Sequence, residues 1–278
     1  MTNTDAGAAG KASLVSCRRL DGGIAVVTLD NPPLNLNTLD TISRLLKVCA
    51  TIADDPDIRV VVVTGAGDKA FCAGSDIREF ADVRHDVVPK KLRRENEAFS
   101  AIEQLPQPVI AALNGVTLGG GAEIALACDI RIIDERARVG FPEVNLGIFP
   151  GSGGVFRLPR VVGLSQAYEL LYTGEPVDAQ EALRIGLVNR IAPTGHALSR
   201  ALSLAGVLAS KPALSLSLVR AAARESLHQD VDTATQRTLE DSHRVFAGPD
   251  IGQGIDAFFA KRPPRFSAPR RASSEETA

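Results

Sequence analysis

The feature of this sequence that most restricts its fold is a short apolar run that is followed by glycines and a helix, and that occurs twice. The first run is residues 58–64 (IRVVVVT), which lead into the turn 65–67 (GAG). The second is residues 109–113 (VIAAL), which lead toward the glycines at 119–121 and an apolar helix. Runs of β-branched and apolar residues bounded by glycine indicate buried strands. Strands that alternate with apolar helices predict an α/β fold.

The remaining segments first extend this pattern and then change it. Further strands are expected at residues 24–29, 130–134 and 187–191, and further helices at 39–53, 155–162 and 165–172. After Pro193 the periodicity is wholly helical, with helices expected at 196–210, 212–227, 231–246 and 251–261. We therefore predict a β/α core with the active site over residues 13–195 and a helical region over 196–266. The polar ends, residues 1–12 and 267–278, are predicted to be disordered tails.

The overall charge argues against a nucleic-acid partner. The formal net charge is −2 and the sequence pI is about 6.1, whereas phosphate binding needs clustered excess Lys and Arg. No apolar run reaches the length of a membrane span, and the N-terminal residues lack the apolar core of a signal peptide. The four cysteines are scattered without a C-x-x-C pair. These observations predict a reduced, cytoplasmic protein with neither a membrane nor a nucleic-acid partner.

The first candidate site is the glycine run 119–121 with Glu123, between a strand and an apolar helix. Glycines let a ligand approach the backbone, and unpaired N–H groups at a helix start favour negative charge. A glycine before a helix is also an ordinary turn, and a lone Glu123 in the first turn can simply complement the helix dipole. On the residues alone, both interpretations stay open.

The second candidate site is Glu143, which stands beside Pro142 in an apolar stretch and precedes the glycine-rich loop 147–154. Glu prefers water unless something holds it. Glu143 is therefore either an active-site group or a solvated loop residue.

The third candidate is Ser75, in the segment 71–77 (FCAGSDI) that follows a strand. Small residues there permit close contact with a ligand, and the Ser75 N–H is a candidate donor. No G-x-S-x-G sequence surrounds it, and the four histidines lie in helical or charged context, so a nucleophilic role has little support. No cluster of His, Asp and Glu has the spacing of metal ligands, and no metal is expected.

These segments together resemble the crotonase (enoyl-CoA hydratase/isomerase) superfamily, over about residues 24–266. The matching segments, in family order, are NPPLNLNTLD, VVVVTGAGDKAFCAGSDIREF, PVIAALNGVTLGGGAEIALACDIRI, FPEVNLGIFPGSGGVFRLPRVVG and GIDAFFAKRPPRF. The resemblance implies a spiral of β/α (ββα) units with a helical C-terminal trimerisation region. It also implies a homotrimer or a dimer of trimers.

The resemblance assigns roles to four residues. The backbone N–H groups of Ser75 and Gly120 match the oxyanion hole that binds the thioester carbonyl, and Glu123 and Glu143 match the two catalytic carboxylates. Water addition to a 2-enoyl-CoA needs a water activated at oxygen and a proton delivered to the α-carbon. We expect Glu123 to activate the water and Glu143 to handle the α-proton. Retention of both glutamates favours a hydratase.

The resemblance also predicts where coenzyme A lies. It is part of the substrate, so no separate cofactor is expected. In one subunit the predicted contacts are Leu34, Ala73, Asp76, Ile77 and Arg78. Phe258 and Lys261 match residues that reach a neighbouring subunit.

This chain departs from the family pattern in two of the matching segments. Pro32-Pro33 stand where the family often has a basic residue, and Val155-Phe156 replace a common Thr-Gln pair, which leaves the acyl length open. Residues 84–94 correspond to a mobile charged segment, and we interpret their basic residues as a solvated face.

Two other functions stay open besides hydration. A double-bond isomerase of the same superfamily needs one proton-shuttling base, so it tolerates the loss of one glutamate. A non-catalytic acyl-CoA-binding or RNA-associated relative is the alternative from a different class. The two glutamates argue against the first of these relatives, and the acidic balance argues against the second.

Overall fold

A six-stranded sheet forms the centre of the molecule. The computed structural model describes residues 14–266, so both predicted tails, residues 1–12 and 267–278, lie outside the described residues. The strand order of the central sheet is β1-β2-β3-β5-β7-β10, with β1 antiparallel to β2 and the other pairs parallel. These strands are β1 (Val15–Leu20), β2 (Ile24–Leu29), β3 (Val60–Gly65), β5 (Val109–Leu113), β7 (Ile130–Asp134) and β10 (Arg190–Ala192).

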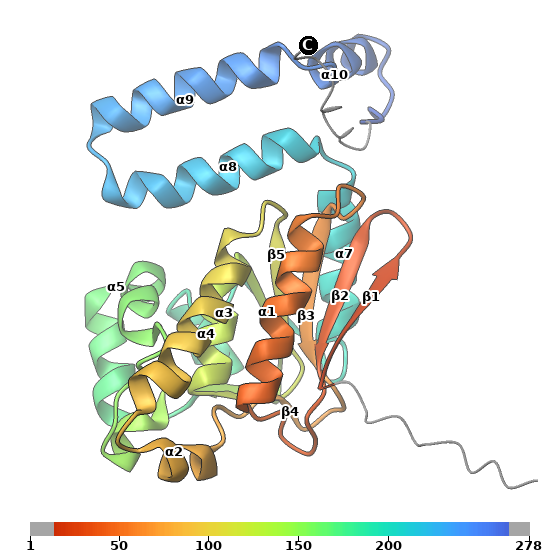
Figure 1. The fold of residues 1–278 in the computed structure, drawn as a ribbon. Coiled ribbons are helices and arrows are strands. Elements are labelled where there is room, and N and C mark those ends of the chain that lie inside the picture. Colours follow the sequence, from red (N-terminus) through yellow and green to blue (C-terminus); the bar gives the residue numbers. More distant parts are fainter. Residues whose placement is uncertain (1–13, 267–278) are drawn as a thin grey trace, which may run out of the picture.

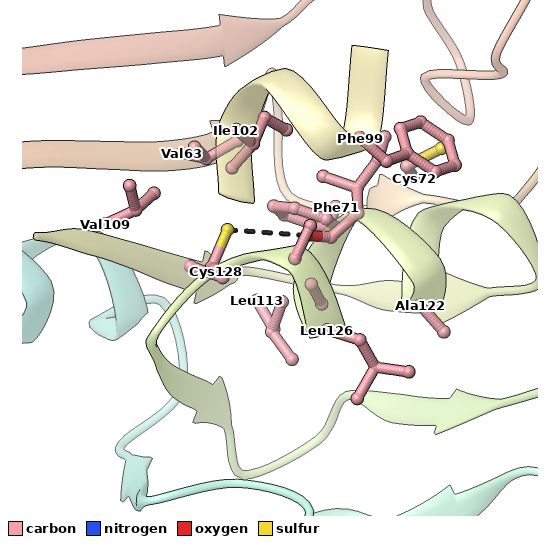
Figure 2. Close-up of a cluster of buried hydrophobic side chains, with 14 of the residues drawn as sticks. Val63, Phe71, Cys72, Phe99, Ile102, Val109, Leu113, Ala122, Leu126 and Cys128 are labelled. Carbon is pink, nitrogen blue, oxygen red and sulfur yellow. Dashed lines mark hydrogen bonds between the residues drawn. The ribbon is translucent and has the colours of Figure 1, made fainter. Parts of the chain in front are cut away.

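Helices cover both faces of this sheet (Figure 1). On one face lie α1 (Leu39–Ala53), α3 (Arg93–Gln104) and α4 (Gly120–Ala127), and on the other lies α7 (Ala197–Ala209). Strand β3 shows why its sequence is apolar throughout. Val61 and Val63 belong to the cluster on the α1 side, which Figure 2 shows in part, whereas Val60 and Val62 pack toward α7. A strand that is buried on both faces cannot alternate with polar residues.

A second, smaller sheet carries the segments with candidate site residues. Its order is β4-β6-β8-β9, and β4, β6 and β8 are parallel. The strands are β4 (Ala70–Cys72), β6 (Val116–Leu118), β8 (Arg138–Gly140) and β9 (Val177–Asp178). Each parallel strand ends just before a candidate residue: β4 before Ser75, β6 before Gly120, and β8 before Glu143. Because the carboxyl ends of parallel strands meet at one edge of a sheet, the topology gathers these residues.

Short helices follow these strands and connect them to the C-terminal part. They are α2 (Ile77–Val83), the π-helical turn η1 (Val88–Leu92), the 3-10 helix η2 (Pro142–Leu146) and α6 (Ala179–Arg184). The longer α5 (Gly154–Thr173) is bent at Gly163, whose φ is 77°, so the two helices expected here are present as two halves.

The C-terminal helices form a hairpin at one end of the molecule (Figure 1). They are α8 (Ala213–Glu225), η3 (Ser226–His228), α9 (Val231–Phe246) and α10 (Asp250–Phe259). Arg220 of α8 joins the hairpin to the core by an ion pair with Asp129, at 2.7 Å. Large apolar side chains of these helices are exposed: Val219, Leu227, Val231, Leu239, Phe246, Ile255, Phe258 and Phe259.

The sequence predicts no membrane-spanning segment, and the length and hydropathy of the described helices bear on this prediction. Within residues 14–266 no single helix is long and apolar enough to cross a membrane. One pair, Ala197–Ala209 with Ala213–His228, passes by length and composition, but it is bent by 109°.

The predicted α/β class is confirmed, and several elements differ from the predictions. The strand expected at 187–191 is β10, which begins at Arg190. Strand β1, helices α2, α3 and α6, and the whole small sheet were not predicted. The basic residues of 84–94 do not all form a solvated face, because Lys91 is fully buried. Its ammonium lies 2.7 Å from the carboxylate of Glu79, and burial of a lysine requires such a partner.

Candidate active site

A cavity of about 640 Å³ lies where the small sheet meets α2, η1, α3 and α4. Much of its wall is apolar and comes from α2, η1 and the loop after η2. These apolar lining residues are Ile77, Phe80, Val87, Val88, Leu92, Leu146, Ile148 and Phe149. Four predicted site residues also line it, namely Ser75, Gly120, Glu123 and Glu143. Because apolar walls strengthen the few polar interactions inside, the arrangement suits a reactive group on an apolar chain.

The two N–H groups expected to form an oxyanion hole are close together. Ser75 pairs with Asn37 in a parallel bridge in which Asn37 bonds the residues on either side of Ser75, so the Ser75 N–H points away. Gly120 is the first residue of α4, and its N–H has no acceptor inside the helix. A Cβ on Gly120 would lie 3.6 Å from the Ser75 nitrogen. Within residues 14–266 neither N–H has an acceptor, so both are available to one carbonyl oxygen.

Glu123 is buried and held by the glycine-rich loop. Its Oε1 accepts hydrogen bonds from the N–H groups of Ser152, at 3.0 Å, and Gly154, at 2.8 Å. The pKa of Glu123 is raised to about 8, mainly by burial and to a smaller extent by the charges of Glu143 and Glu95, against the lowering effect of the two N–H bonds. The carboxyl group can therefore hold a proton near neutral pH.

Glu143 lies on η2, and its carboxyl group is largely buried in the cavity wall. Burial raises the pKa of Glu143 to about 7, and the charge of Glu95 contributes. Its Oε2 is buried without a hydrogen bond to any described residue. A Cβ on Gly119 would lie 3.0 Å from Oε1, so a larger residue before α4 would press on this carboxyl group. A buried carboxyl oxygen that no protein donor satisfies is available to a ligand or a water.

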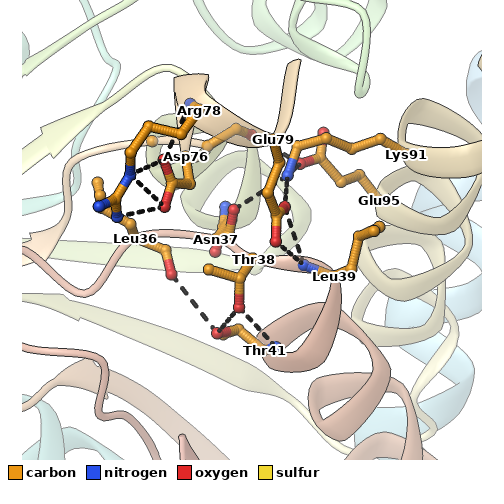
Figure 3. A network of polar contacts seen from close by, with 12 residues as sticks. Leu36, Asn37, Thr38, Leu39, Thr41, Asp76, Arg78, Glu79, Lys91 and Glu95 are labelled. Atoms are coloured by element: carbon orange, nitrogen blue, oxygen red, sulfur yellow. Dashed lines mark hydrogen bonds and ion pairs between the residues drawn. The ribbon is translucent and has the colours of Figure 1, made fainter. Parts of the chain in front are cut away.

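A third glutamate, which the sequence did not predict, also lines the cavity. Glu95 of α3 is buried, and its two oxygens accept hydrogen bonds from the hydroxyls of Ser75, at 2.6 Å, and Ser152, at 2.5 Å. Figure 3 shows Lys91 between Glu79 and Glu95, and the ammonium lies 3.5 Å from the Glu95 carboxylate. In the sequence Glu95 stands in the charged run RRENE, which gives no signal that one of its residues is buried.

The structure brings together some of the predicted coenzyme A contacts. Ala73 and Ile77 line the cavity, and the Ala73 N–H donates to the carbonyl of Leu34 at 3.0 Å. Asp76 and Arg78 do not line it. The Asp76 carboxylate caps α2 and forms an ion pair with Arg78 at 2.6 Å, and the Arg78 side chain is 82% exposed. The guanidinium is thus at the surface beside the cavity.

Phe258 and Lys261 do not reach the cavity of their own chain. Phe258 belongs to α10 and is 78% exposed, and Lys261 follows that helix. In Figure 1, α10 is at the opposite end of the molecule from α2, which lines the cavity. Their predicted contact with a neighbouring subunit stays a prediction.

Side chains that could bind a metal ion can be described for the same part of the chain. Among residues 14–266 no group of three or more His, Cys, Asp and Glu side chains has the arrangement of a metal site.

Comparisons with known proteins identify the family of the chain. The sequence profile of "Enoyl-CoA hydratase/isomerase" matches residues 19–269. The chain is 40% identical over 243 residues to the short-chain-enoyl-CoA hydratase of Clostridium acetobutylicum, covering 87% of this chain and 93% of that protein. It is 38% identical to the crotonyl-CoA hydratase of Syntrophomonas wolfei, covering 87% and 94%.

Solved structures give the same result for the fold. The crystal structure of an enoyl-CoA hydratase from Bacillus anthracis superposes with a TM-score of 0.89 at 36% identity, covering 92% of this chain and 100% of that one. An enoyl-CoA hydratase structure from Geobacillus kaustophilus also gives 0.89, at 33% identity, covering 93% and 98%. The expected crotonase-like fold is therefore confirmed, and the chain belongs to the enoyl-CoA hydratase/isomerase family.

Proposed function

We propose that this protein is an enoyl-CoA hydratase, which adds water reversibly to the double bond of a 2-enoyl-CoA thioester. One observation carries the proposal. Two carboxyl groups with raised pKa values, Glu123 and Glu143, line the same cavity as the N–H groups of Ser75 and Gly120, which have no acceptor among residues 14–266.

The N–H pair explains how the enzyme stabilises the reaction's negative charge. When water attacks the β-carbon, charge moves to the thioester oxygen and an enolate forms. The N–H groups of Ser75 and Gly120 donate to this oxygen. Gly120 is also the first residue of α4, where the helix dipole stabilises negative charge. Each preorganised donor of this kind contributes about 3–4 kcal/mol to the transition state in comparable enzymes.

The carboxyl pair supplies the proton transfers. Glu123 has one oxygen fixed by two N–H groups, which leaves the other free to orient the attacking water and, when the shared proton is on Glu143, to deprotonate it. Glu143, whose Oε2 has no hydrogen-bond partner in the described part of the chain, delivers the proton to the α-carbon. Two close carboxyl groups share their protons and titrate as a pair, so the pair holds about one proton near neutral pH. With one proton present, the site can accept one and deliver one in the same turnover.

The remaining contacts follow from the position of the cavity. We place the coenzyme A portion across Leu34, Ala73 and Ile77, near Asp76, with Arg78 at the phosphates. Its exposed guanidinium suits that contact, as a planar cation binds phosphate in a bidentate manner.

The same proposal extends to assembly and compartment. We propose a homotrimer, or a dimer of trimers, in which Phe258 and Lys261 of one subunit approach the ligand of the next. Their exposure on α10 supports this contact, and the exposed apolar face of the C-terminal helices supports an interface. We also propose a cytoplasmic enzyme, because Cys49, Cys72 and Cys128 are free thiols within the core.

The test is a spectrophotometric assay with a panel of 2-enoyl-CoA thioesters. The measured quantity is the loss of the conjugated double bond. We expect hydration of at least one short or medium substrate, and its reversal from the 3-hydroxyacyl-CoA. A 3-enoyl-CoA panel tests the family's isomerase reaction. Interconversion of 3-enoyl and 2-enoyl thioesters without hydration would overturn the hydratase assignment. So would acyl-CoA binding without turnover.

A further inference from the structure

Glu95 is a buried carboxylate for which the proposed reaction has no role. It is 1% exposed and comes from α3, whereas the other cavity glutamates come from α4 and η2. Burying a third negative group beside Glu123 and Glu143 is unfavourable unless specific donors hold it. The identity of those donors indicates what Glu95 does.

The donors to Glu95 belong to the two segments that hold the reacting groups. The Ser75 hydroxyl donates to Oε1 of Glu95, and the Ser75 N–H is one of the oxyanion donors. The Ser152 hydroxyl donates to Oε2, and the Ser152 N–H donates to Glu123. Asn96, the next residue on α3, donates from its side chain to the Gly151 carbonyl at 2.9 Å, which also fixes this loop against the helix.

We propose that Glu95 is a positioning residue that links the oxyanion-hole turn at Ser75 to the loop at Ser152, and so fixes the separation between the oxyanion donor and Glu123. The inference rests on the proposed hydratase function of this site. Because one carboxylate accepts a hydrogen bond at each oxygen, it fixes the distance between the two serine hydroxyls that donate to it. A catalytic geometry must be held closely, because small displacements of reacting groups lower the rate strongly.

The charges around Glu95 define a second effect of the same residue. Lys91 from η1 faces it at 3.5 Å and is itself paired with Glu79 of α2. Glu123 from α4 and Glu143 from η2 face it across the cavity, and the charge of Glu95 raises the pKa of both.

Two further groups lie near this network. Cys72 of β4 also has its pKa raised to about 12, first by burial and then partly by Glu95. Arg157 of α5 contacts the Ser152 carbonyl at 3.2 Å and pairs with Glu103. Removing the Glu95 charge should therefore lower the pKa of the catalytic pair, whereas removing the serine hydroxyls leaves that charge in place.

The test compares Glu95→Gln, the double variant Ser75→Ala/Ser152→Ala, and the triple variant that combines them. We expect the first two each to lower kcat about tenfold with little change in KM, since positioning acts on the transition state. Because all three changes break one linkage, the triple variant should be no more than about twofold slower than the slower parent. The control is Glu97→Gln, the same charge change at an exposed position of α3, which should leave kcat unchanged.

The pH dependence separates positioning from a merely structural role. Glu95→Gln should move both limbs of the kcat profile to lower pH by about half a unit, because a like charge has been removed. The double serine variant should move them less. Circular dichroism and thermal melting establish that each variant is folded.

Three results would overturn the inference. The first is wild-type kcat in folded Glu95→Gln, and the second is a triple variant about a hundredfold slower, as expected for independent effects. The third is wild-type kcat in the double serine variant, which refutes the linkage even if the Glu95→Gln protein does not fold. A folded wild-type protein without hydratase activity would instead overturn the proposed function.

Discussion

Replacing Glu123 by Gln should stabilise the protein by an amount that grows with pH. In the native protein the pKa of Glu123 is raised to about 8, from its ordinary value of 4.5. The folded chain therefore binds a proton that the unfolded chain releases between these two values. This group's contribution is fully present below the unfolded pKa and is lost as pH rises toward the folded pKa. The loss is at most about 1.4 kcal/mol in the free energy of unfolding per pH unit.

The substitution removes this dependence and keeps the local structure. A glutamine oxygen can still accept the N–H groups of Ser152 and Gly154, so the loop keeps its two bonds. The difference in unfolding free energy, variant minus wild type, should rise between about pH 5 and pH 8 by about 2–4 kcal/mol. The upper figure assumes that Glu123 titrates alone, and proton sharing with Glu143 reduces it.

The assay is urea unfolding across this pH range at one fixed protein concentration, because the proposed assembly would make stability depend on concentration. Glu97→Gln serves as the matched control, since it neutralises an exposed glutamate and should give a flat difference. A difference between Glu123→Gln and wild type that stays constant or falls with pH would refute the reasoning, because it would mean that Glu123 is ionised in the folded protein.

Four further predictions concern activity and assembly. Glu143→Gln should lower kcat for hydration at least about a hundredfold, as expected for loss of a general acid or base, and near-normal turnover in the enoyl-CoA assay would contradict its role. Gly120→Pro deletes one oxyanion donor and should cost at least about 3 kcal/mol in activation free energy. Ser75→Ala keeps its N–H and should lose about threefold by the positioning effect alone, and if this variant is inactive while folded by circular dichroism, the hydroxyl takes part in the chemistry. Deletion from Gly252 onward should give smaller particles in light scattering and weaker coenzyme A binding, a prediction that fails if the full-length protein is a monodisperse monomer.

The long elements were predictable from the sequence because each has enough residues to show a period. Residues 24–29 and 130–134 are the strands β2 and β7, and residues 39–53 are the helix α1, with the predicted bounds. The three strands β4, β6 and β8 were not predicted because each has three residues, too few to show any alternation. Their existence depends on pairing between segments far apart in the chain.

The site could be predicted only where a residue matched a family motif. Ser75, Gly120, Glu123 and Glu143 line one cavity, as their predicted roles require, while those roles stay predictions until they are assayed. Glu95 was missed for a physical reason. Charged residues are usually exposed, and only the tertiary contacts with two serine hydroxyls and a buried lysine make its burial possible.

The origin of the cavity's parts has a consequence for how such an enzyme can change its substrate. The donors and carboxyl groups follow the three parallel strands of the small sheet, whereas the apolar wall comes from separate segments around Phe80, Val88 and Phe149. Main-chain pairing sets the first group, and exchangeable side chains set the second. Acyl selectivity is therefore a separately adjustable property of this scaffold, and a library confined to wall positions can alter which chains are accepted while the reacting centre is inherited intact.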